Sequence, residues 1–268
     1  MAFEYKEVLP GVWHIQDALG VCMTLLVGKE RALLVDTGYG LEDVAACVGS
    51  LTDRPLTVIL THAHHDHALG ARWFDAVYLF PQDMDIYPVY TGKQRRQNVL
   101  ESARARGVRM DERKFMHAVL PTPSPLEEGV VDLGGLRAQI ILCPGHTPGS
   151  AVVYVPERKL LLTGDDWNPC TWLFFREALT VQTYRENVRR LLALPFRHLL
   201  CPHRTELFDR FMLEDFVEGL RDEALLRTKD VPTGDVEGVH TVEIALPYHQ
   251  VLVFDQDKFA LERAKEAR

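Results

Sequence analysis

The sequence predicts an α+β fold in which two β-sheets pack face to face between helices, a four-layer αββα sandwich. Short apolar runs separated by glycine-containing turns dominate the first 40 residues, which is typical of strands. From residue 41 on, helical patterns are interleaved with further strands. The segment after residue 129 repeats this order, so a second sheet with its own helices is expected.

In the first half, residues 41–51 are predicted to form a helix because Leu41, Val44 and Val48 return to one face at helical spacing. The runs around this helix are short and apolar, as strands are. The predicted elements are, in order, strands over 11–17, 22–27 and 31–36, the helix over 41–51, strands over 56–60 and 77–80, and a helical region over 82–113.

The second half is interpreted by the same periodicities. The elements predicted there are strands over 129–132, 136–142, 151–155 and 160–163, a helix over 182–194, a strand over 198–201, a helix over 211–226, strands over 239–245 and 251–254, and a charged C-terminal helix. The last two strands either complete a pocket or form the edge of a homodimer, and the sequence leaves both open.

Composition indicates a single-domain enzyme over residues 1–268, with a helical, basic insertion at about 82–114 and a C-terminal extension at about 206–268. The 47% hydrophobic and 25% charged residues are ordinary globular usage. A net charge of −8 argues against a nucleic-acid partner. Five cysteines without a C-x-x-C pair, no signal-peptide core and no membrane-spanning stretch predict a cytoplasmic protein with no membrane partner.

The most informative motif is H-x-H-x-D-H over residues 62–67, directly after the predicted strand over 56–60. The loop can turn His62, His64, Asp66 and His67 toward one pocket. Imidazole suits zinc and iron, and a carboxylate adds charge that holds a second cation. The motif therefore indicates a metal-dependent enzyme.

Three more candidate ligands follow later strands. His146 lies in Pro144-Gly145-His146-Thr147, Asp165 follows the run ending at Thr163, and His203 follows the strand over 198–201. Enzymes with α/β architecture place their chemistry in loops at strand ends. Seven candidates at four strand ends favour a metal site over polar loops.

In this order, the H-x-H-x-D-H motif, the P-G-H-T-P-G-S histidine, the T-G-D aspartate and the late histidine resemble the metallo-β-lactamase-fold hydrolase superfamily, glyoxalase II and lactonase branch included. Val35-Asp36-Thr37-Gly38 also matches that family's strand-end motif, and the resemblance covers about residues 10–205. It implies a four-layer αββα sandwich. It says little about substrate, because one fold hosts many reactions.

The resemblance also implies the roles of the ligands. His62, His64 and His146 would hold one metal, Asp66, His67 and His203 the second, and Asp165 would bridge the two. The cofactors would be two divalent ions, zinc first, with iron or manganese as alternatives. A hydroxide bridging metals about 3.5–4 Å apart would attack a carbonyl carbon, and Asp66 would orient it as the catalytic residue.

The neighbours of these ligands are expected to play other parts. His65 is expected to point away from the metals, and Asp36 to hydrogen-bond the loop beside them. For Asp166, contact with the site and solvation are equally open. Buried packing is expected for the three cysteines near the motifs, which are Cys143, Cys170 and Cys201.

Substrate specificity would come from the segments around the pocket. Residues 93–114 hold eight basic and three acidic side chains, so either a lid for an anionic small-molecule substrate or a solvated helix face is expected. The aromatic stretch Trp167–Phe175 is the other candidate wall, with core packing of Trp172 and Phe175 as its alternative.

The function predicted is a hydrolase of an ester, thioester, lactone or related carbonyl bond that works through a binuclear metal centre. The alternative is a sulfur dioxygenase of this fold with a single iron on positions such as His62, His146 and Asp165. A β-lactamase and a metal-binding module without catalysis rank lower. An export signal is missing for the former, and the complete ligand set disfavours the latter.

Overall fold

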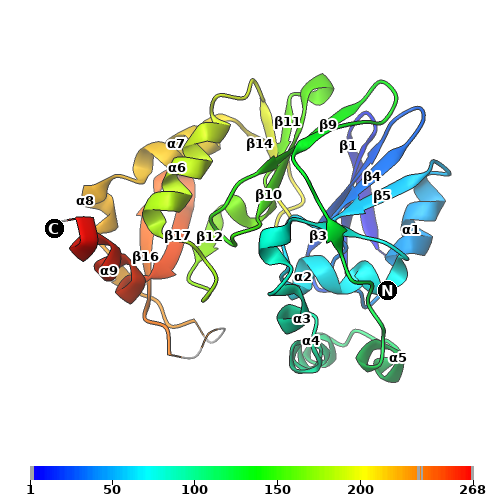
Figure 1. Ribbon diagram of the computed structural model, residues 1–268, viewed down its shortest axis with the longest axis horizontal. Helices are drawn as coiled ribbons and strands as arrows, with labels where there is room; N and C mark the ends of the chain where they lie inside the picture. Colours follow the sequence, from blue (N-terminus) through cyan, green and yellow to red (C-terminus); the bar gives the residue numbers. More distant parts are fainter. Residues whose placement is uncertain (1–2, 234–235, 237, 267–268) are drawn as a thin grey trace.

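The computed structural model describes residues 3–233, 236 and 238–266, so both ends of the predicted domain 1–268 lie outside it. Two large sheets stand side by side in the right half of the view in Figure 1, and a smaller sheet lies to their left. Within the described residues, no helix is long and apolar enough to cross a bilayer.

The N-terminal sheet has seven strands in chain order. Its first four strands pair antiparallel and the later ones pair parallel, which lets β4 and β5 end at the same edge. The strands are β1 (Glu4–Leu9), β2 (Val12–Gln16), β3 (Cys22–Val27), β4 (Ala32–Val35), β5 (Leu56–Ile59), β6 (Tyr78–Leu79) and β7 (Ser124–Pro125).

The second sheet has six strands in the order β14-β13-β11-β10-β9-β8. Its only parallel pair is β11 with β13 among the described residues, so these two strands also end at one edge. The strands are β8 (Gly129–Asp132), β9 (Arg137–Leu142), β10 (Ala151–Val155), β11 (Leu160–Leu162), β13 (His198–Leu200) and β14 (Phe208–Asp209).

Side chains alternate between the two faces of each strand, and this alternation defines the layers of the fold. In β4, Leu33 and Val35 face the second sheet, while Ala32 and Leu34 pack with the helix α1 (Val44–Leu51). In β10, Val153 faces the first sheet, and Val152 and Tyr154 lie in the cluster that includes α6 (Val181–Leu191). The order helix, sheet, sheet, helix confirms the predicted αββα sandwich.

A third sheet of four strands was not predicted. It joins β12 (Cys170–Leu173) to the C-terminal strands in the order β12-β17-β16-β15. The other members are β15 (Lys229–Asp230), β16 (Thr241–Leu246) and β17 (Gln250–Asp255). Leu252 and Phe254 of β17 share one hydrophobic cluster with α6. The second of the two predicted final strands, β17, pairs parallel with β12 about 80 residues earlier in the chain, as Cys170 opposite Val251 shows.

The remaining helices cover the edges of these sheets. A group of short helices surrounds the loop after β5 at the lower centre of Figure 1. The helices are α2 (His65–Ala68), η1 (Leu69–Trp73), η2 (Pro81–Asp83), α3 (Tyr87–Tyr90), α4 (Lys93–Ala105), α5 (Glu112–Met116), η3 (Pro156–Arg158), η4 (Gly164–Asp166), α7 (Phe211–Gly219), α8 (Asp222–Leu225), η5 (Pro247–His249) and α9 (Gln256–Glu266).

Three sequence expectations need correction. The helix predicted over 211–226 breaks at Leu220 into α7 and α8. Strand β1 was missed because its first four side chains are exposed and three of them are charged, so it lacks an apolar period. The aromatic stretch over 167–175, for which no strand was predicted, contains β12, in which Thr171 and Leu173 are buried and Cys170 and Trp172 are exposed.

Candidate metal centre

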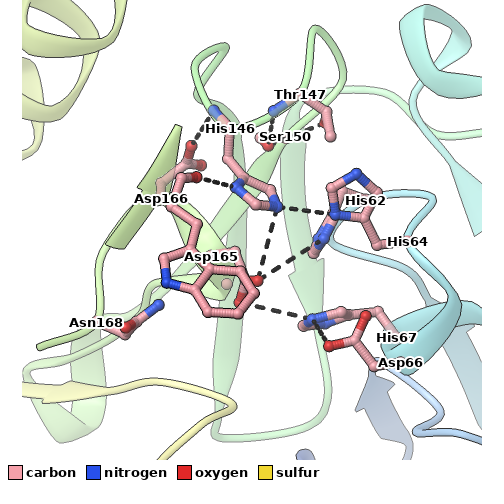
Figure 2. A network of polar contacts seen from close by, with 12 residues as sticks. His62, His64, Asp66, His67, His146, Thr147, Ser150, Asp165, Asp166 and Asn168 are labelled. Carbon is pink, nitrogen blue, oxygen red and sulfur yellow. Dashed lines mark hydrogen bonds and ion pairs between the residues drawn. The ribbon is translucent and has the colours of Figure 1, made fainter. Parts of the chain in front are cut away.

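Four strand ends bring the predicted ligands together. His62 and His64 follow β5, and the single helical turn α2 then carries Asp66 and His67. His146, Asp165 and His203 follow β9, β11 and β13. Figure 2 shows the side chains from the first loop facing those from the other loops around one point.

Three groups of these side chains have donor atoms close enough to share an ion. In each group, the ligand atoms lie within 4.8 Å of one another. The groups are His62 with His64 and His146, His62 with His67 and Asp165, and Asp66 with His67 and His203. All seven predicted residues therefore belong to one continuous cluster, and His65 belongs to none of the three groups.

Asp165 lies between the two histidine sets. Its Oδ2 atom is 4.0 Å from Nε2 of His62 and 3.6 Å from Nε2 of His146. Its Oδ1 atom is 3.5 Å from Nε2 of His67 and 3.1 Å from Nε2 of His203. Nε2 of His203 also lies 3.2 Å from Oδ2, so this oxygen contacts histidines of both sets. The carboxylate as a whole is within reach of both sets, as a ligand shared by two cations would be.

The outer ring nitrogens of four histidines have their own partners. Nδ1 of His62 lies 3.1 Å from Thr61 Oγ1, and Nδ1 of His67 lies 2.9 Å from Asp36 Oδ2. Nδ1 of His146 lies 2.7 Å from the Trp172 carbonyl. Nε2 of His64 lies 2.7 Å from Glu177 Oε1. These contacts hold the rings and leave the inner nitrogens for a metal.

The inner atoms fit a cation better than they fit each other. Nε2 of His62, Nε2 of His67 and Oδ1 of Asp165 are buried and have no hydrogen-bond partner among the described residues. Nδ1 of His64 and Nε2 of His146 face each other at 2.9 Å. Buried polar atoms without partners are costly, and a divalent ion bound by nitrogen and carboxylate ligands would satisfy them.

Burial and charge set the protonation of the cluster. Burial lowers the pKa of His146 to about 4 and the pKa of His62 well below its usual value, so both rings are neutral ligands at pH 7. Burial opposes ionisation of Asp165, but His203 and His67 together hold its pKa well below the usual range. Burial opposes protonation of His67 and His203, but Asp165 and Asp66 raise the pKa of both rings. Without a metal, the cluster therefore combines neutral His62 and His146 with two rings whose protonated form the carboxylates favour.

Asp36 holds the motif loop, as expected. Its carboxylate accepts hydrogen bonds from the backbone N–H of Thr61 at 2.7 Å and from the Thr61 hydroxyl. It also contacts His67. Its φ of 66° lies in the left-handed region, which is uncommon for a residue other than glycine and is typical of functional sites.

Asp83 was not singled out from the sequence, but it joins two ligand loops. Its Oδ2 atom accepts from Ala63 N at 3.0 Å and from Thr147 Oγ1 at 2.8 Å, and its Oδ1 atom accepts from Gly149 N at 2.6 Å. A Cβ at Gly149 would lie 2.7 Å from the Asp83 carboxylate, so glycine is required for this approach. No local pattern in the sequence announces this contact.

Glu177 was also missed. It accepts from the Tyr90 hydroxyl in a short hydrogen bond and contacts His64, although it lies 113 residues from that histidine. Burial opposes its ionisation, but His64 and Tyr90 lower its pKa to about 2. In the sequence, the only feature that could have indicated this role is that Glu177 is a charged residue just after the aromatic stretch.

The predictions for Asp166 and for the three cysteines near the motifs are partly confirmed and partly wrong. Asp166 is buried and accepts from His146 N at 3.4 Å, so solvation is excluded for it. Cys143 and Cys201 are buried, as expected, whereas Cys170 is exposed, because β12 turns it away from the core. Figure 2 shows Asp166 beside the backbone of His146 and Thr147 close to Ser150.

Two cavities open beside the cluster. The larger, about 390 Å³, is lined by His64, His65, Asp66, Asp165 and His203, and by residues of α4 and the aromatic stretch. The smaller, about 220 Å³, shares Asp165, Trp172 and His203 with it and is completed by Asn168, Cys170 and Arg204. Both Trp172 and Phe175 thus line a cavity, and Phe175 is also part of the core.

A profile of the metallo-beta-lactamase superfamily matches residues 17–203, which span every candidate ligand. The chain belongs to the metallo-beta-lactamase superfamily. Its similarity to proteins named as hydrolases of this superfamily assigns it to the hydrolases.

Curated relatives give the closer comparisons. Acyl-coenzyme A thioesterase MBLAC2 of Gallus gallus is 28% identical over 225 residues, which cover 74% of this chain and 78% of that protein. Probable metallo-hydrolase YqgX of Bacillus subtilis is 30% identical over 145 residues, 52% of this chain and 63% of that protein. Hydroxyacylglutathione hydrolase of Cereibacter sphaeroides is 29% identical over 147 residues, 54% of this chain and 46% of that protein.

Solved structures support the same fold. TTHA1623, solved in a di-iron-bound form, is 27% identical with a TM-score of 0.53, and the match covers 74% of this chain and 93% of that one. A metallo-beta-lactamase family protein of Thermus thermophilus has a TM-score of 0.58 at 22% identity, with 82% and 81% coverage.

Proposed function

We propose that this protein is a binuclear metal-dependent thioesterase. The observation that carries the proposal is the position of Asp165, whose carboxylate lies within 4.0 Å of ring nitrogens from both sets of histidines. A carboxylate that binds one ion would need only one of these sets. As a setting for this activity we propose the cytosol, a compartment that suits a chain whose five cysteines are all unpaired.

The residues that would hold the metals follow from the three groups. His62, His64 and His146 would bind one ion through their inner nitrogens, and Asp66, His67 and His203 would bind the other, with Asp165 between them. Bound divalent ions would supply a water of lowered pKa and polarise the substrate carbonyl. Zinc is the first choice for imidazole-rich ligands, and iron is the alternative.

The chain's own residues would orient the reaction. Asp66 lines the larger cavity, and its Oδ2 atom lies 3.5 Å from Nε2 of His67 and 3.8 Å from Nε2 of His203. Burial opposes ionisation of this carboxyl, but the neighbouring imidazoles, His67 above all, hold its pKa well below the usual range. It is therefore ionised and can accept a proton from water. Trp172 and Phe175 exclude solvent on one side of the cavity.

A thioester is proposed as substrate on the basis of the relatives. Two of the named relatives are an acyl-coenzyme A thioesterase and a hydroxyacylglutathione hydrolase, and both names describe thioester cleavage. The cavity beside the candidate ligands would place a carbonyl group with a good leaving group next to the metals. Other esters and lactones remain substrates to be compared in the same assay.

Two measurements test the proposal together. Elemental analysis of protein purified without added metal should give about two zinc or iron ions per chain, and acyl thioesters should be hydrolysed. Asp165→Asn should lower kcat by at least about a hundredfold, because the shared ligand loses its charge. The exposed Asp85→Asn variant, also lacking one negative charge, should retain both metal and activity.

Two results would overturn it. About one iron per chain, with oxygen uptake in the presence of a thiol persulfide, would establish the dioxygenase alternative. Full metal loading without turnover of thioesters, lactones or β-lactams would indicate a metal-binding module without catalysis.

A further inference from the structure

We propose that Arg95 and Arg106 of the α4 segment form an anion-binding subsite in the larger cavity, so that the substrate is a thioester with a negatively charged leaving group. This inference rests on the thioesterase function proposed above. It extends that function from the reacting bond to the part of the substrate that is distant from it.

The spacing of the lining residues defines one face of a helix. From α4 and its C-cap, the cavity is lined by Arg95, Asn98, Val99, Ser102 and Arg106. These positions follow the i, i+3, i+4, i+7, i+11 pattern of a single helical stripe. Eleven residues at 1.5 Å each place the two arginines about 16 Å apart along the axis. Polar and cationic groups therefore run along the cavity wall.

The neighbouring face of α4 is buried and fixes this orientation. Leu100 and Ala103 are buried in a cluster with Leu19, Leu41 and Leu69. Leu69 follows α2, which carries Asp66 and His67, so α4 packs directly against the segment of the metal ligands. Figure 1 shows α4 below α2 and α3 on this side of the molecule. The stripe is held by the core and does not depend on a flexible loop.

The two lining arginines differ from other basic residues of the segment. Arg104 forms a paired contact with Glu112 at 2.6 Å, and Lys114 lies 3.7 Å from Asp111. Arg96 is directed to backbone carbonyls, with its shortest bond to Ala118 O at 2.6 Å. These side chains already have structural partners, so they are not available for a ligand.

Arg95 and Arg106 have no carboxylate partner among the described residues. The Arg95 guanidinium lies 4.7 Å from the centre of the Tyr90 ring, a contact that orients it without neutralising its charge. Arg106 donates one N–H to the Leu19 carbonyl at 2.5 Å, and its other donors have no hydrogen-bond partner in the described part of the chain. Two uncompensated guanidinium groups on one wall favour phosphate or carboxylate, which they bind in a bidentate manner.

The acidic residues of the cavity do not cancel these charges. Asp66 and Asp165 line its floor, but each faces histidines of the candidate metal centre. The lining also includes an aromatic part, formed by Trp172 and Phe175. An acyl group against the aromatic wall and an anionic leaving group along α4 would place the thioester between them, over the metal ligands.

Binding without turnover tests the subsite by itself. Titration calorimetry of the metal-loaded protein with S-methyl-coenzyme A tests a phosphate anion, and S-methylglutathione tests a carboxylate anion. Arg95→Gln and Arg106→Gln should each weaken the tighter of the two ligands about tenfold, which is the value of one charge-assisted hydrogen bond. Lys93→Gln should leave the affinity unchanged, since Lys93 is exposed and lies about 200° around the helix from Arg95.

Kinetics give the second readout. The anionic substrate is acyl-coenzyme A or acylglutathione, and the neutral substrate is the N-acetylcysteamine thioester of the same acyl group. Each arginine variant should reduce the ratio of kcat/KM for the anionic substrate to kcat/KM for the neutral one about tenfold, mainly through KM. Because Arg95 contacts Tyr90, zinc content is measured for both variants, and Arg106→Gln carries the conclusion if Arg95→Gln loses metal.

The outcomes are separable. Equal loss for anionic and neutral substrates, or weaker binding only in Arg204→Gln of the smaller cavity, would overturn the subsite. Charge-dependent binding of the thioethers without hydrolysis of any thioester would retain the subsite and overturn the thioesterase. If both thioethers fail to bind at millimolar concentration, the subsite is also overturned, whatever the hydrolytic activity of the protein.

Discussion

At the scale of single residues, the candidate centre depends on side chains that hold the ligands as much as on the ligands. Thr61, Asp36, Glu177 and the Trp172 carbonyl each contact the outer nitrogen of a different histidine. Such contacts fix the tautomer and the ring orientation of a metal-binding imidazole. Asp36 was expected from its motif, whereas Glu177 was not, because no spacing rule connects it with His64.

Replacing Glu177 by glutamine tests this contact. Loss of the carboxylate that holds His64 Nε2 should weaken zinc binding by about 10–100-fold, the usual effect of removing such a partner. Competition with a chromophoric chelator measures the affinity directly. Tyr90→Phe, which removes the hydroxyl bound to Glu177, should have a smaller effect in the same direction.

The matched control for this variant is Glu127→Gln, which removes the same charge from an exposed position. It should bind zinc as the unmodified protein does. Unchanged zinc affinity in Glu177→Gln would show that His64 is held by its surroundings alone.

His14 provides a pH-dependent test outside the candidate centre. It is buried, its Nδ1 lies 3.1 Å from Thr24 Oγ1, and its Nε2 lies 2.9 Å from the Arg204 carbonyl, next to His203. Burial lowers the pKa of His14, although the backbone hydrogen bond to Arg204 opposes the shift. The folded protein therefore keeps this ring neutral where the unfolded chain becomes protonated, and the stabilisation is lost as pH falls below about 6.5.

The free energy of unfolding of the zinc-loaded protein and of His14→Gln should be measured by denaturant titration between pH 7.5 and pH 5.5. The variant should be less stable at pH 7.5 by about 1 kcal/mol, the value of a typical hydrogen bond, and the difference should shrink at pH 5.5. A difference that stays constant over this interval would contradict a neutral, buried His14.

At the scale of elements, the ends of four strands position the candidate ligands, and side-chain contacts between the loops hold these loops together. β5, β9, β11 and β13 were predicted within about two residues, because apolar runs of strand length are a local signal. The contacts of Asp83 with Ala63 and Gly149 span 20 and 66 residues, so nothing local could predict them. This carboxylate ties the loop of His62 and His64 to the loop of His146.

Asp83→Asn tests the connection between the two loops. An amide in place of the buried carboxylate puts a donor where three donors already point, so about 1–3 kcal/mol of stability should be lost, together with part of the zinc affinity. Thermal unfolding followed by circular dichroism, and the chelator competition, measure both. The exposed Asp85→Asn variant lies two residues away and should match the unmodified protein.

At the scale of the whole molecule, the candidate centre lies between the two halves of the sandwich. Its ligands come from loops of both large sheets, and Trp172 of the third sheet contacts His146. Bound metal should therefore stabilise the complete fold. With ligand at about a thousand times its Kd, binding contributes about 4 kcal/mol, which corresponds to a Tm shift of about 10 °C for a chain of this size.

Calorimetric melts with zinc, after chelation, and after zinc is added back test this expectation. Chelation should lower Tm by about 10 °C, and added zinc should restore it. His203→Ala, which removes one ligand, should show a smaller difference between the two conditions. A Tm that does not respond to chelation would mean that the cluster is stable without a cation.

The sequence by itself determined most strands of the two large sheets, the αββα order and the seven residues that cluster, since strand periodicity and motif spacing are local properties of the chain. Only the tertiary structure decided the pairing of β12 with the C-terminal strands, the contacts of Glu177 and Asp83, and which arginines of α4 face the cavity. The physical reason is that these interactions join residues far apart in the chain, and packing, not local preference, brings them together.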